Sequence, residues 1–475
     1  MTIEHTKLKQ MKMEQTTLLI IVSALFLITL SAVHIKINFL TMKNVTKKIV
    51  LSATLLFMGT MYAQQEKGIT GNENWLDSWT EFQPKTEDYS APTQILTGNI
   101  TKDTKLTKKD TYLLLGSVFV TDSTTLTIEP GTVIIGDFQT NGSLTISKGS
   151  TLLAEGSETD PIIFTSNRSV KKEGDWGGLF ILGDAPINKF GNASAVDFGL
   201  KPSSFQYTSY GGDNVESNSG ILKYVRIEYA GKRTKDHGYF NGLTLAGVGK
   251  ATILENIMIS YSGGNSFNIL GGEVNLNKMV SYKSKGNDYT FNYGTQCNIK
   301  NSLAVRSPYV SGVNGSRSLS VSSYEEKGEV DFTKKGTAVK AQNLTLVNLS
   351  KDLQGDIKIG LVDEAIYIAN HASLDITQSV VSGYNPAVLL ERSIIINNEN
   401  LEKIKFSKMY FNNCNGNIFT EGNTNNEDLE NWYGSSAFFN VYSKTSDSET
   451  FIDSKNKKYP DFRLRINKIV ASTED

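Results

Sequence analysis

The chain has 475 residues, enough for two or three ordinary domains or for one long repeat array. Lysine and arginine number 48 against 49 aspartate and glutamate, and this balance excludes the electrostatic attraction on which binding to nucleic acid or to an anionic membrane depends. The 40 glycines and only nine prolines indicate a β-rich protein with many tight turns.

Two apolar stretches precede the body of the chain. A basic region that begins at Met42, an apolar core and a small residue at Ala63 predict a secretory signal peptide over residues 42–63. Residues 1–41 are interpreted as an over-extended start, with a short apolar leader as the alternative. The mature chain is expected to be exported to the periplasm, the outer surface or the medium, and to contain no further membrane span.

Residues 64–105 show no repeat and are predicted to be a lead-in that caps the first coil of a solenoid. The open apolar end of a solenoid has to be covered. Four aromatic residues of the lead-in are expected to cover it: Trp75, Trp79, Phe82 and Tyr89.

Residues 106–425 are predicted to form a parallel β-helix. The segment Leu126-Thr-Ile-Glu-Pro-Gly131-Thr returns 18 residues later as Leu144-Thr-Ile-Ser-Lys-Gly149-Ser. Strands with alternating polarity that turn at glycines with this spacing form successive coils. Residues 426–475 are expected to close the far end, starting with a capped helical turn at Asn426.

One six-residue pattern occurs three times in the middle of the chain, over residues 224–229, 256–261 and 277–282, at offsets of 32 and then 21 residues. Its sixth residue is a tyrosine, and the alternation of side chains predicts that Tyr229, Tyr261 and Tyr282 form a stack inside the solenoid. Asparagine opens the second and third copies, and the later repeats open at Asn301, Asn343 and Gln378. These amides are expected to be corner residues because asparagine tolerates left-handed turns. Lys278 is the exception to the inward pattern.

Residues 184–219 interrupt the repeat and are predicted to form a lateral loop, the kind of segment that carries function on a solenoid. Aromatic faces stack on sugar rings, and polar neighbours bind hydroxyl groups. The loop and one later tyrosine therefore supply the candidate ligand-binding residues: Phe205, Tyr207, Tyr210, Asp213, Glu216 and Tyr239. The alternative is that these rings only seal the side of the coils.

Several motifs together resemble those of an exported family of right-handed parallel β-helix proteins of Bacteroidota, with the pectate-lyase superfold. The matching segments are Trp79-Thr-Glu-Phe-Gln-Pro84, Leu126-Thr-Ile-Glu-Pro-Gly-Thr-Val133, Gly174-Asp-Trp-Gly-Gly-Leu179, Tyr210-Gly-Gly212, residues 220–231 and residues 241–249. The resemblance implies an envelope or secreted location and no established activity. Family members carry aspartate-rich turns, whereas this chain retains only Asp288 at these places, so we expect no cofactor and no metal, although calcium stays open.

Catalytic chemistry finds little support in the sequence. A glycoside hydrolase needs two carboxylates that flank one bond, and the chain has no Asp-Asp pair. Arg306-Ser-Pro-Tyr309 resembles a pectate lyase element only faintly. The histidines and the two cysteines, Cys297 and Cys414, lack metal-ligand spacing, and the cysteines are expected to lie about five coils apart without a bridge.

The sequence therefore favours a non-catalytic protein that binds a glycan or another surface ligand, with no assigned catalytic residue. Two alternatives stay open. One is a polysaccharide lyase or glycoside hydrolase, and the other is an adhesin or a partner of an outer-membrane receptor. A polysaccharide or an outer-membrane protein is the expected partner.

Overall fold

The structure is a computed structural model, and it describes residues 67–310 and 316–465. The predicted signal peptide and residues 1–41 lie outside the described residues. The described residues belong to one compact unit. In this part of the chain, no helix is long and apolar enough to cross a membrane.

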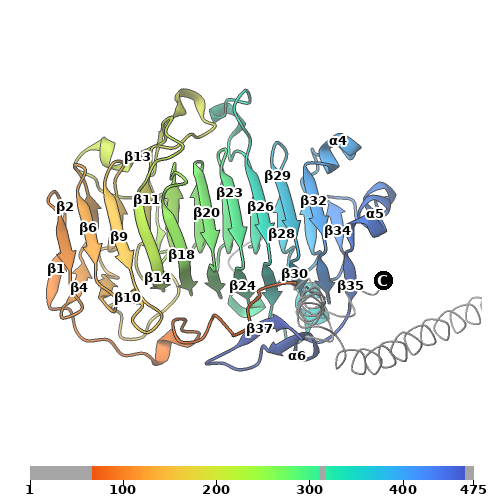
Figure 1. Cartoon of the computed structure of the whole chain (residues 1–475), viewed down its shortest axis with the longest axis horizontal. Helices are drawn as coiled ribbons and strands as arrows, with labels where there is room; N and C mark the ends of the chain where they lie inside the picture. The colour runs from red at the N-terminus through yellow and green to blue at the C-terminus, as the bar shows by residue number, and fades with distance from the viewer. Residues whose placement is uncertain (1–66, 311–315, 466–475) are drawn as a thin grey trace, which may run out of the picture. The chain divides into compact units, whose positions relative to one another are not determined.

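The body is a right-handed parallel β-helix, as predicted, whose coils follow one another along the long axis (Figure 1). Most strands belong to two long parallel sheets. The 20-stranded sheet contains β1 (Gln94–Leu96), β3 (Thr104–Leu106), β4 (Thr111–Leu114), β6 (Thr125–Ile128), β7 (Val133–Gly136), β9 (Thr151–Glu155), β10 (Ile162–Ser166), β14 (Gly220–Glu228), β18 (Ile253–Ser260), β20 (Glu273–Asn277), β21 (Val280–Tyr282), β23 (Gln296–Lys300), β24 (Leu303–Arg306), β26 (Ala338–Gln342), β27 (Thr345–Asn348), β29 (Ser373–Thr377), β30 (Val380–Ser382), β32 (Ile404–Ser407), β33 (Tyr410–Asn412) and β35 (Val441–Ser443). The 11-stranded sheet contains β2 (Asn99–Ile100), β5 (Ser117–Val120), β8 (Ser143–Ile146), β11 (Leu179–Leu182), β17 (Leu243–Ala246), β19 (Phe267–Leu270), β22 (Tyr289–Asn292), β25 (Leu319–Val321), β28 (Ile366–Ile368), β31 (Val388–Leu390) and β34 (Ile418–Thr420).

Short elements decorate these sheets. They are three antiparallel pairs, β12 (Ser194–Ala195) with β13 (Ser209–Tyr210), β15 (Arg233–Thr234) with β16 (Gly238–Tyr239) and β36 (Phe451–Asp453) with β37 (Asp461–Leu464), and the helices α3 (Leu353–Lys358), α4 (Asn398–Leu401), α5 (Glu427–Tyr433) and α6 (Asp447–Thr450).

Each coil contributes strands to three ladders, and two of these ladders merge in the long strand β14. Residues 220–223 of β14 pair with β9, and residues 225–227 pair with β10. The coils start at Gln94 and continue to Ser443, beyond the predicted limits of 106–425 at both ends. Their inward side chains form one continuous apolar core. In the 11-stranded sheet, for example, Leu243, Phe267 and Tyr289 lie directly over one another.

The third copy of the six-residue pattern is registered one residue away from the predicted alignment. Ile259 pairs with Ser281 and Ser260 pairs with Tyr282, so the true offset is 22 residues. A slip of one residue turns every side chain of a strand to the other face. Tyr282 therefore points outward and packs on Phe82, with the ring centroids 4.9 Å apart, and the prediction of an interior stack of three tyrosines is wrong.

The same shift accounts for Lys278. It occupies the left-handed corner, with φ of 56°, that Asn256 occupies in the preceding coil with φ of 52°. The corner prediction is confirmed for the other opening residues, since Asn301, Asn343 and Gln378 also have positive φ. Asn277, by contrast, is the last residue of β20.

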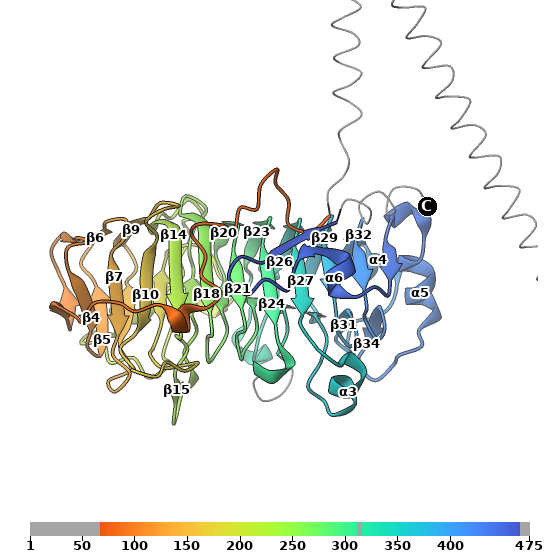
Figure 2. The ribbon, with the colours of Figure 1, turned by 90° about the horizontal axis from the view of Figure 1, so that it is seen from below.

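Residues 67–93, here called the strap, do not cover the first coil, and that prediction is wrong. The strap lies along the outer side of the 20-stranded sheet (Figure 2), where the backbone N–H of Gly68 donates to the carbonyl of Gln378 at 2.8 Å. Further along, Trp79 packs edge-on against Tyr224 at 5.8 Å. The outward side chains of the 20-stranded sheet beneath the strap are apolar. Four residues of the strap bury them in a second apolar cluster: Ile69, Leu76, Trp79 and Phe82.

The predicted closing segment divides between two places. At the far end, α5 follows the N-cap Asn426, whose side chain accepts from the N–H of Leu429 at 3.2 Å, and Leu429 packs on the interior core. The segment after β35 returns to the strap, and Phe451 and Phe462 of the β36–β37 hairpin join its cluster. The cysteines are free, as predicted.

The burial of Trp79 predicts that the strap stabilises the coils. We expect Trp79→Ala to lower the free energy of unfolding by about 3–5 kcal/mol, because it removes a fully buried indole. Phe205→Ala is the matched control and should change it by less than about 0.5 kcal/mol, since that ring is largely exposed. Thermal and chemical denaturation of the two variants measure the difference. Equal midpoints would show that the strap adds nothing to the stability of the coils.

Candidate functional site

The six predicted ligand-binding residues do not converge on one site. Phe205 is 74% exposed, whereas Tyr210 is only 2% exposed and packs with the loop against the outer face of the 11-stranded sheet. Tyr207 is half-buried beside Phe119 in the same cluster. Most of this lateral loop, which projects above the sheets in Figure 1, therefore seals the side of the coils, the alternative that the sequence left open.

The two predicted carboxylates of the loop lie at its surface and have partners there. Asp213 accepts from the side-chain amide of Asn192 at 2.5 Å. Glu216 forms an ion pair with Lys250 at 2.5 Å. Neither carboxylate lines the groove that is described next, whereas Tyr239 does.

A groove of about 460 Å³ lies beside Tyr239, and it is here called the asparagine groove. It crosses the turns that lead into β17, β19, β22 and β25, so four successive coils contribute to it. Its lining residues are Phe198, Tyr239, Asn241, Gly263, Gly264, Asn265, Asn268, Lys285, Gly286, Asn287, Ser316, Arg317 and Glu325.

A ladder of amides forms the floor of the groove. The Asn241 side-chain oxygen accepts from the backbone N–H of Asn265 at 3.1 Å, and the Asn265 oxygen accepts from the N–H of Asn287 at 2.9 Å. The Asn287 oxygen in turn accepts from the N–H of Arg317 at 2.8 Å. Each amide thus satisfies a backbone donor of the next coil and holds the turns in register. Among the described residues, the side-chain nitrogen of Asn265 has no acceptor and stays free to donate.

Asn268 is a side chain of the groove that forms no hydrogen bond with the described residues. It lies on the outer face of β19 between Thr244 and Thr290, and it is 6% exposed. No described residue forms a hydrogen bond with its amide, although buried polar side chains normally have partners. A buried amide that faces a groove without a protein partner is suited to bind a ligand.

Aromatic and charged side chains form the walls. Tyr239, at the end of the β15–β16 hairpin, is exposed, and Phe198 packs behind it against Phe240 at 6.3 Å. On the other side, Arg317 pairs with Glu364 and lies over the ring of Tyr367 at 4.1 Å. The positive charge of Arg317 is thereby neutralised within the protein.

Next to the groove, Asp288 belongs to a buried network rather than to a metal site. Its carboxylate accepts from Arg306 at 3.2 Å, from Ser281 at 2.5 Å and from Ser318 at 2.9 Å. Burial raises the pKa of Asp288, and the Arg306 guanidinium opposes this shift. Both carboxylate oxygens are engaged, and the cation beside them is the guanidinium, so these residues do not fit the calcium site that the resemblance left open. In the part of the chain that the structure describes, no group of three potential metal ligands comes together.

The same geometry bears on the faint resemblance to a lyase element. Arg306 is buried, and its guanidinium also donates to the carbonyl of Gly286 at 2.9 Å. Glu228, the last residue of β14, is buried beneath the strap against Arg226 at 3.3 Å and Tyr89. Neither side chain lines the asparagine groove.

These observations define a class: a right-handed parallel β-helix protein with ligand-sized grooves on its flank. The sequence profile of the family described as the pectate-lyase like β-helix domain matches residues 98–454, which is most of the chain, and the chain belongs to this family. Among solved structures, the crystal structure of the Dettilon tailspike protein (gp208) is similar, with 11% identity and a TM-score of 0.27. That similarity covers 69% of this chain and 61% of the tailspike chain. No curated protein matches the sequence.

Sequence reasoning found Tyr239 and missed the amides of the floor. A signal for them exists, because Gly264-Asn265 and Gly286-Asn287 recur after 22 residues, the true offset of this coil. With the offset taken as 21, the two asparagines did not align. Asn268 has no signal of its own, since it is one of several outward residues of its strand.

The contrast between the two asparagines gives a stability prediction. Asn265→Ala should lower the free energy of unfolding by about 1 kcal/mol, because the N–H of Asn287 loses its acceptor. Asn268→Ala should leave it unchanged or raise it slightly, because the amide has no partner among the described residues. Chemical denaturation of both variants tests this difference. A loss of stability in Asn268→Ala as large as that in Asn265→Ala would show that Asn268 has a structural partner.

Proposed function

We propose that the protein is an exported, non-catalytic glycan-binding protein and that its binding site is the asparagine groove. The observation that carries the proposal is Asn268, a buried amide in the groove without a partner among the described residues. The amide of Asn268 is not closed off from solvent, so it opens onto the groove and water solvates it in the free protein. A ligand hydroxyl can replace that water and bind the amide directly.

The walls and the floor suit a sugar ring in complementary ways. The exposed ring of Tyr239 offers a flat apolar face on which a pyranose ring can stack. The amides of Asn265 and Asn268 offer a donor and further hydrogen-bonding atoms to hydroxyl groups. The side-chain nitrogens of Asn241 and Asn287 already donate to Thr244 at 3.3 Å and to Thr290 at 3.1 Å. Within the row, the Asn265 nitrogen therefore stays available to a sugar hydroxyl, next to the amide of Asn268.

The charges of the groove favour binding over hydrolysis. Hydrolysis of a glycosidic bond uses two carboxylates on either side of that bond. Of the residues that line the groove, Glu325 alone carries a carboxylate, and it accepts from the Asn292 side-chain amide at 3.5 Å. The alternative of a lyase or hydrolase is tested by assays for reducing sugars and unsaturated products across polysaccharides, with and without calcium. If the protein cleaves a polysaccharide and Glu325→Gln abolishes this activity, the protein is an enzyme and the proposal of non-catalytic binding is wrong.

Binding is tested with the signal-free protein on glycan arrays and by pull-down with insoluble polysaccharides. We expect retention on at least one polysaccharide. Tyr239→Ala and Asn268→Ala should each weaken it by about tenfold, equivalent to about 1.4 kcal/mol. Phe205→Ala is the control, because that exposed ring lies outside the groove and should leave affinity unchanged. Absence of retention on every polysaccharide would refute the proposal.

Export is the second part of the proposal, and it rests on the sequence of residues 42–63. The mature protein should begin at Gln64, after cleavage behind Ala63. Mass spectrometry of the N-terminal peptide from the native protein, together with cell fractionation, measures both the cleavage site and the compartment. An uncleaved chain in the cytoplasm would contradict export.

A further inference from the structure

Both ends of the solenoid are open edges among the described residues. At the first coil, β1 pairs only with β4, β2 only with β5 and β3 only with β6. At the far end, β34 continues the ladder only from β31, and β35 only from β33. Figure 1 shows no described element beyond β1 and β2 at one end, and α5 at the other. Half of the backbone groups of such edge strands have no ladder partner.

The first coil exposes apolar residues at positions that the second coil buries. Leu96 pairs with Leu114 and Ile100 pairs with Val120, and both of these partners are fully buried in the core. Leu96 and Ile100 pack against the same core but are only partly buried. Ile95, between the two ladders of the first coil and solvent, is 61% exposed. The apolar interior therefore reaches the open face of the first coil.

The last coil leaves part of its interior open as well. Tyr442 pairs with the buried Phe411 and stacks on its ring with the centroids 5.3 Å apart, so it continues an inward column, and yet it is 43% exposed. The helix α5 covers the core beside β32, where the Tyr433 hydroxyl group donates to the carbonyl of Ile404 at 2.8 Å. A groove of about 510 Å³ remains between α5, β34 and Tyr442. The far end thus presents an aromatic face beside a groove.

The open strands at the two ends belong to the same ladders. β1 and β35 are the first and last strands of one ladder of the 20-stranded sheet. β2 and β34 are the first and last strands of the 11-stranded sheet. The strands of both ladders run parallel, so a copy placed on the end of another brings β1 over β35 and β2 over β34 in the direction that each ladder already has. The third ladder ends at β32, and α5 lies beside that strand.

The far end is acidic. Residues 409–443 contain no lysine or arginine, and they contain four acidic residues: Glu421, Glu427, Asp428 and Glu430. None of the four forms an ion pair with another described residue. Glu427 and Glu430 are exposed, and Glu430 lines the groove together with Tyr442. The negative charge at this end is therefore uncompensated within the described chain.

The first coil carries an excess of the opposite charge. Residues 94–110 contain four lysines and two aspartates. Lys105 pairs with Glu129 at 2.7 Å. The other three lysines are exposed and form no ion pair with a described residue: Lys102, Lys108 and Lys109. Asp103 accepts from the N–H of Thr125 in the second coil at 2.9 Å, so its carboxylate is turned away from the open face.

We propose that the first coil of one copy docks on the last coil of a second copy, so that the protein assembles head to tail. β1 and β2 continue the ladders that end at β35 and β34, and Leu96 covers the exposed ring of Tyr442. Lys102, in the turn after β2, faces the acidic segment after β34, which contains Glu421 and Glu427. Two different surfaces meet in this contact, so its repetition gives an open chain of copies and not a closed dimer.

The test measures the size of the mature full-length chain by sedimentation velocity over a series of protein concentrations. We expect dimers and then longer species to appear as the concentration rises. Added salt should weaken the association, because it screens the charges of the two ends. Hydrogen exchange should slow at the amides of β1 and β35 as the copies associate. A chain that stays monomeric at every concentration, or a dimer that adds no third copy, would overturn the proposal.

Charge reversal ties the association to the two ends. Glu427→Lys with Glu430→Lys reverses the charge of the far end, and Lys102→Glu with Lys109→Glu reverses that of the first coil. Each double variant alone should associate at least about tenfold more weakly than the wild type. An equimolar mixture of the two should recover the association, because the reversed far end of one variant then meets the reversed first coil of the other.

The matched control is Lys235→Glu with Lys335→Glu. Both lysines are exposed on middle coils, one in the β15–β16 hairpin and the other before β26, and this variant should associate like the wild type. Circular dichroism checks that each variant is folded, and the concentration series of the wild type does not depend on the variants. Wild-type association in both end variants, or a mixture of folded end variants that stays monomeric, is the result that contradicts head-to-tail docking.

Discussion

The structure depends on one constraint: each coil has to lie directly over the coil before it. In a parallel ladder the hydrogen bonds run between successive coils, and a residue therefore stacks on its equivalent in the neighbouring coil. Leu243, Phe267 and Tyr289 form such a stack inside the solenoid. A shift by one residue would place these side chains in water and bring polar neighbours into the core. The interior thus determines the register, and the register places every outward residue.

The same constraint leaves an apolar surface on the outer face of the 20-stranded sheet. The outward residues of one ladder are apolar, among them Met258, Val280 and Leu303, and they would be exposed in a bare solenoid. The strap and the β36–β37 hairpin, from opposite ends of the chain, cover them together. They meet where Arg463 donates to the carbonyl of Gly71 at 2.8 Å. Covering this face joins both ends of the described chain to the middle of the solenoid.

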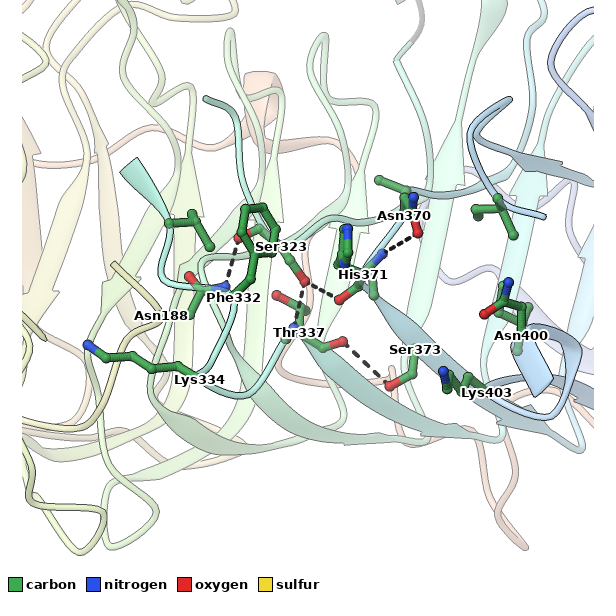
Figure 3. Close-up of a pocket in the computed structure, with 16 residues that line it drawn as sticks. Asn188, Ser323, Phe332, Lys334, Thr337, Asn370, His371, Ser373, Asn400 and Lys403 are labelled. Carbon is green, nitrogen blue, oxygen red and sulfur yellow. Dashed lines mark hydrogen bonds between the residues drawn. The ribbon is translucent and has the colours of Figure 1, made fainter. Parts of the chain in front are cut away.

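The two grooves arise where stacked turns meet loops that project from different coils. In the asparagine groove, stacking brings Asn241, Asn265 and Asn287 into one row, and the β15–β16 hairpin adds the ring of Tyr239. In a second groove further along the solenoid, the turn before β29 places the ring of His371, whose φ is 60°, beside the ring of Phe332 (Figure 3). The stacked turns supply fixed polar groups, while the loops supply the exposed rings. This division of roles lets one rigid fold carry two grooves with different lining residues.

The sequence by itself determined the class of fold, because period-two strands and glycine turns such as Gly131 and Gly149 are local patterns. It also determined the left-handed corners at Asn256 and Asn301, since the tolerance for positive φ belongs to the residue type. Only the tertiary structure decided that Trp79 packs on the flank, that Tyr282 points outward and that Asn268 has no partner among the described residues. These outcomes depend on which segments distant in the chain bury the most apolar surface together, and a pattern within one segment carries no information about that competition.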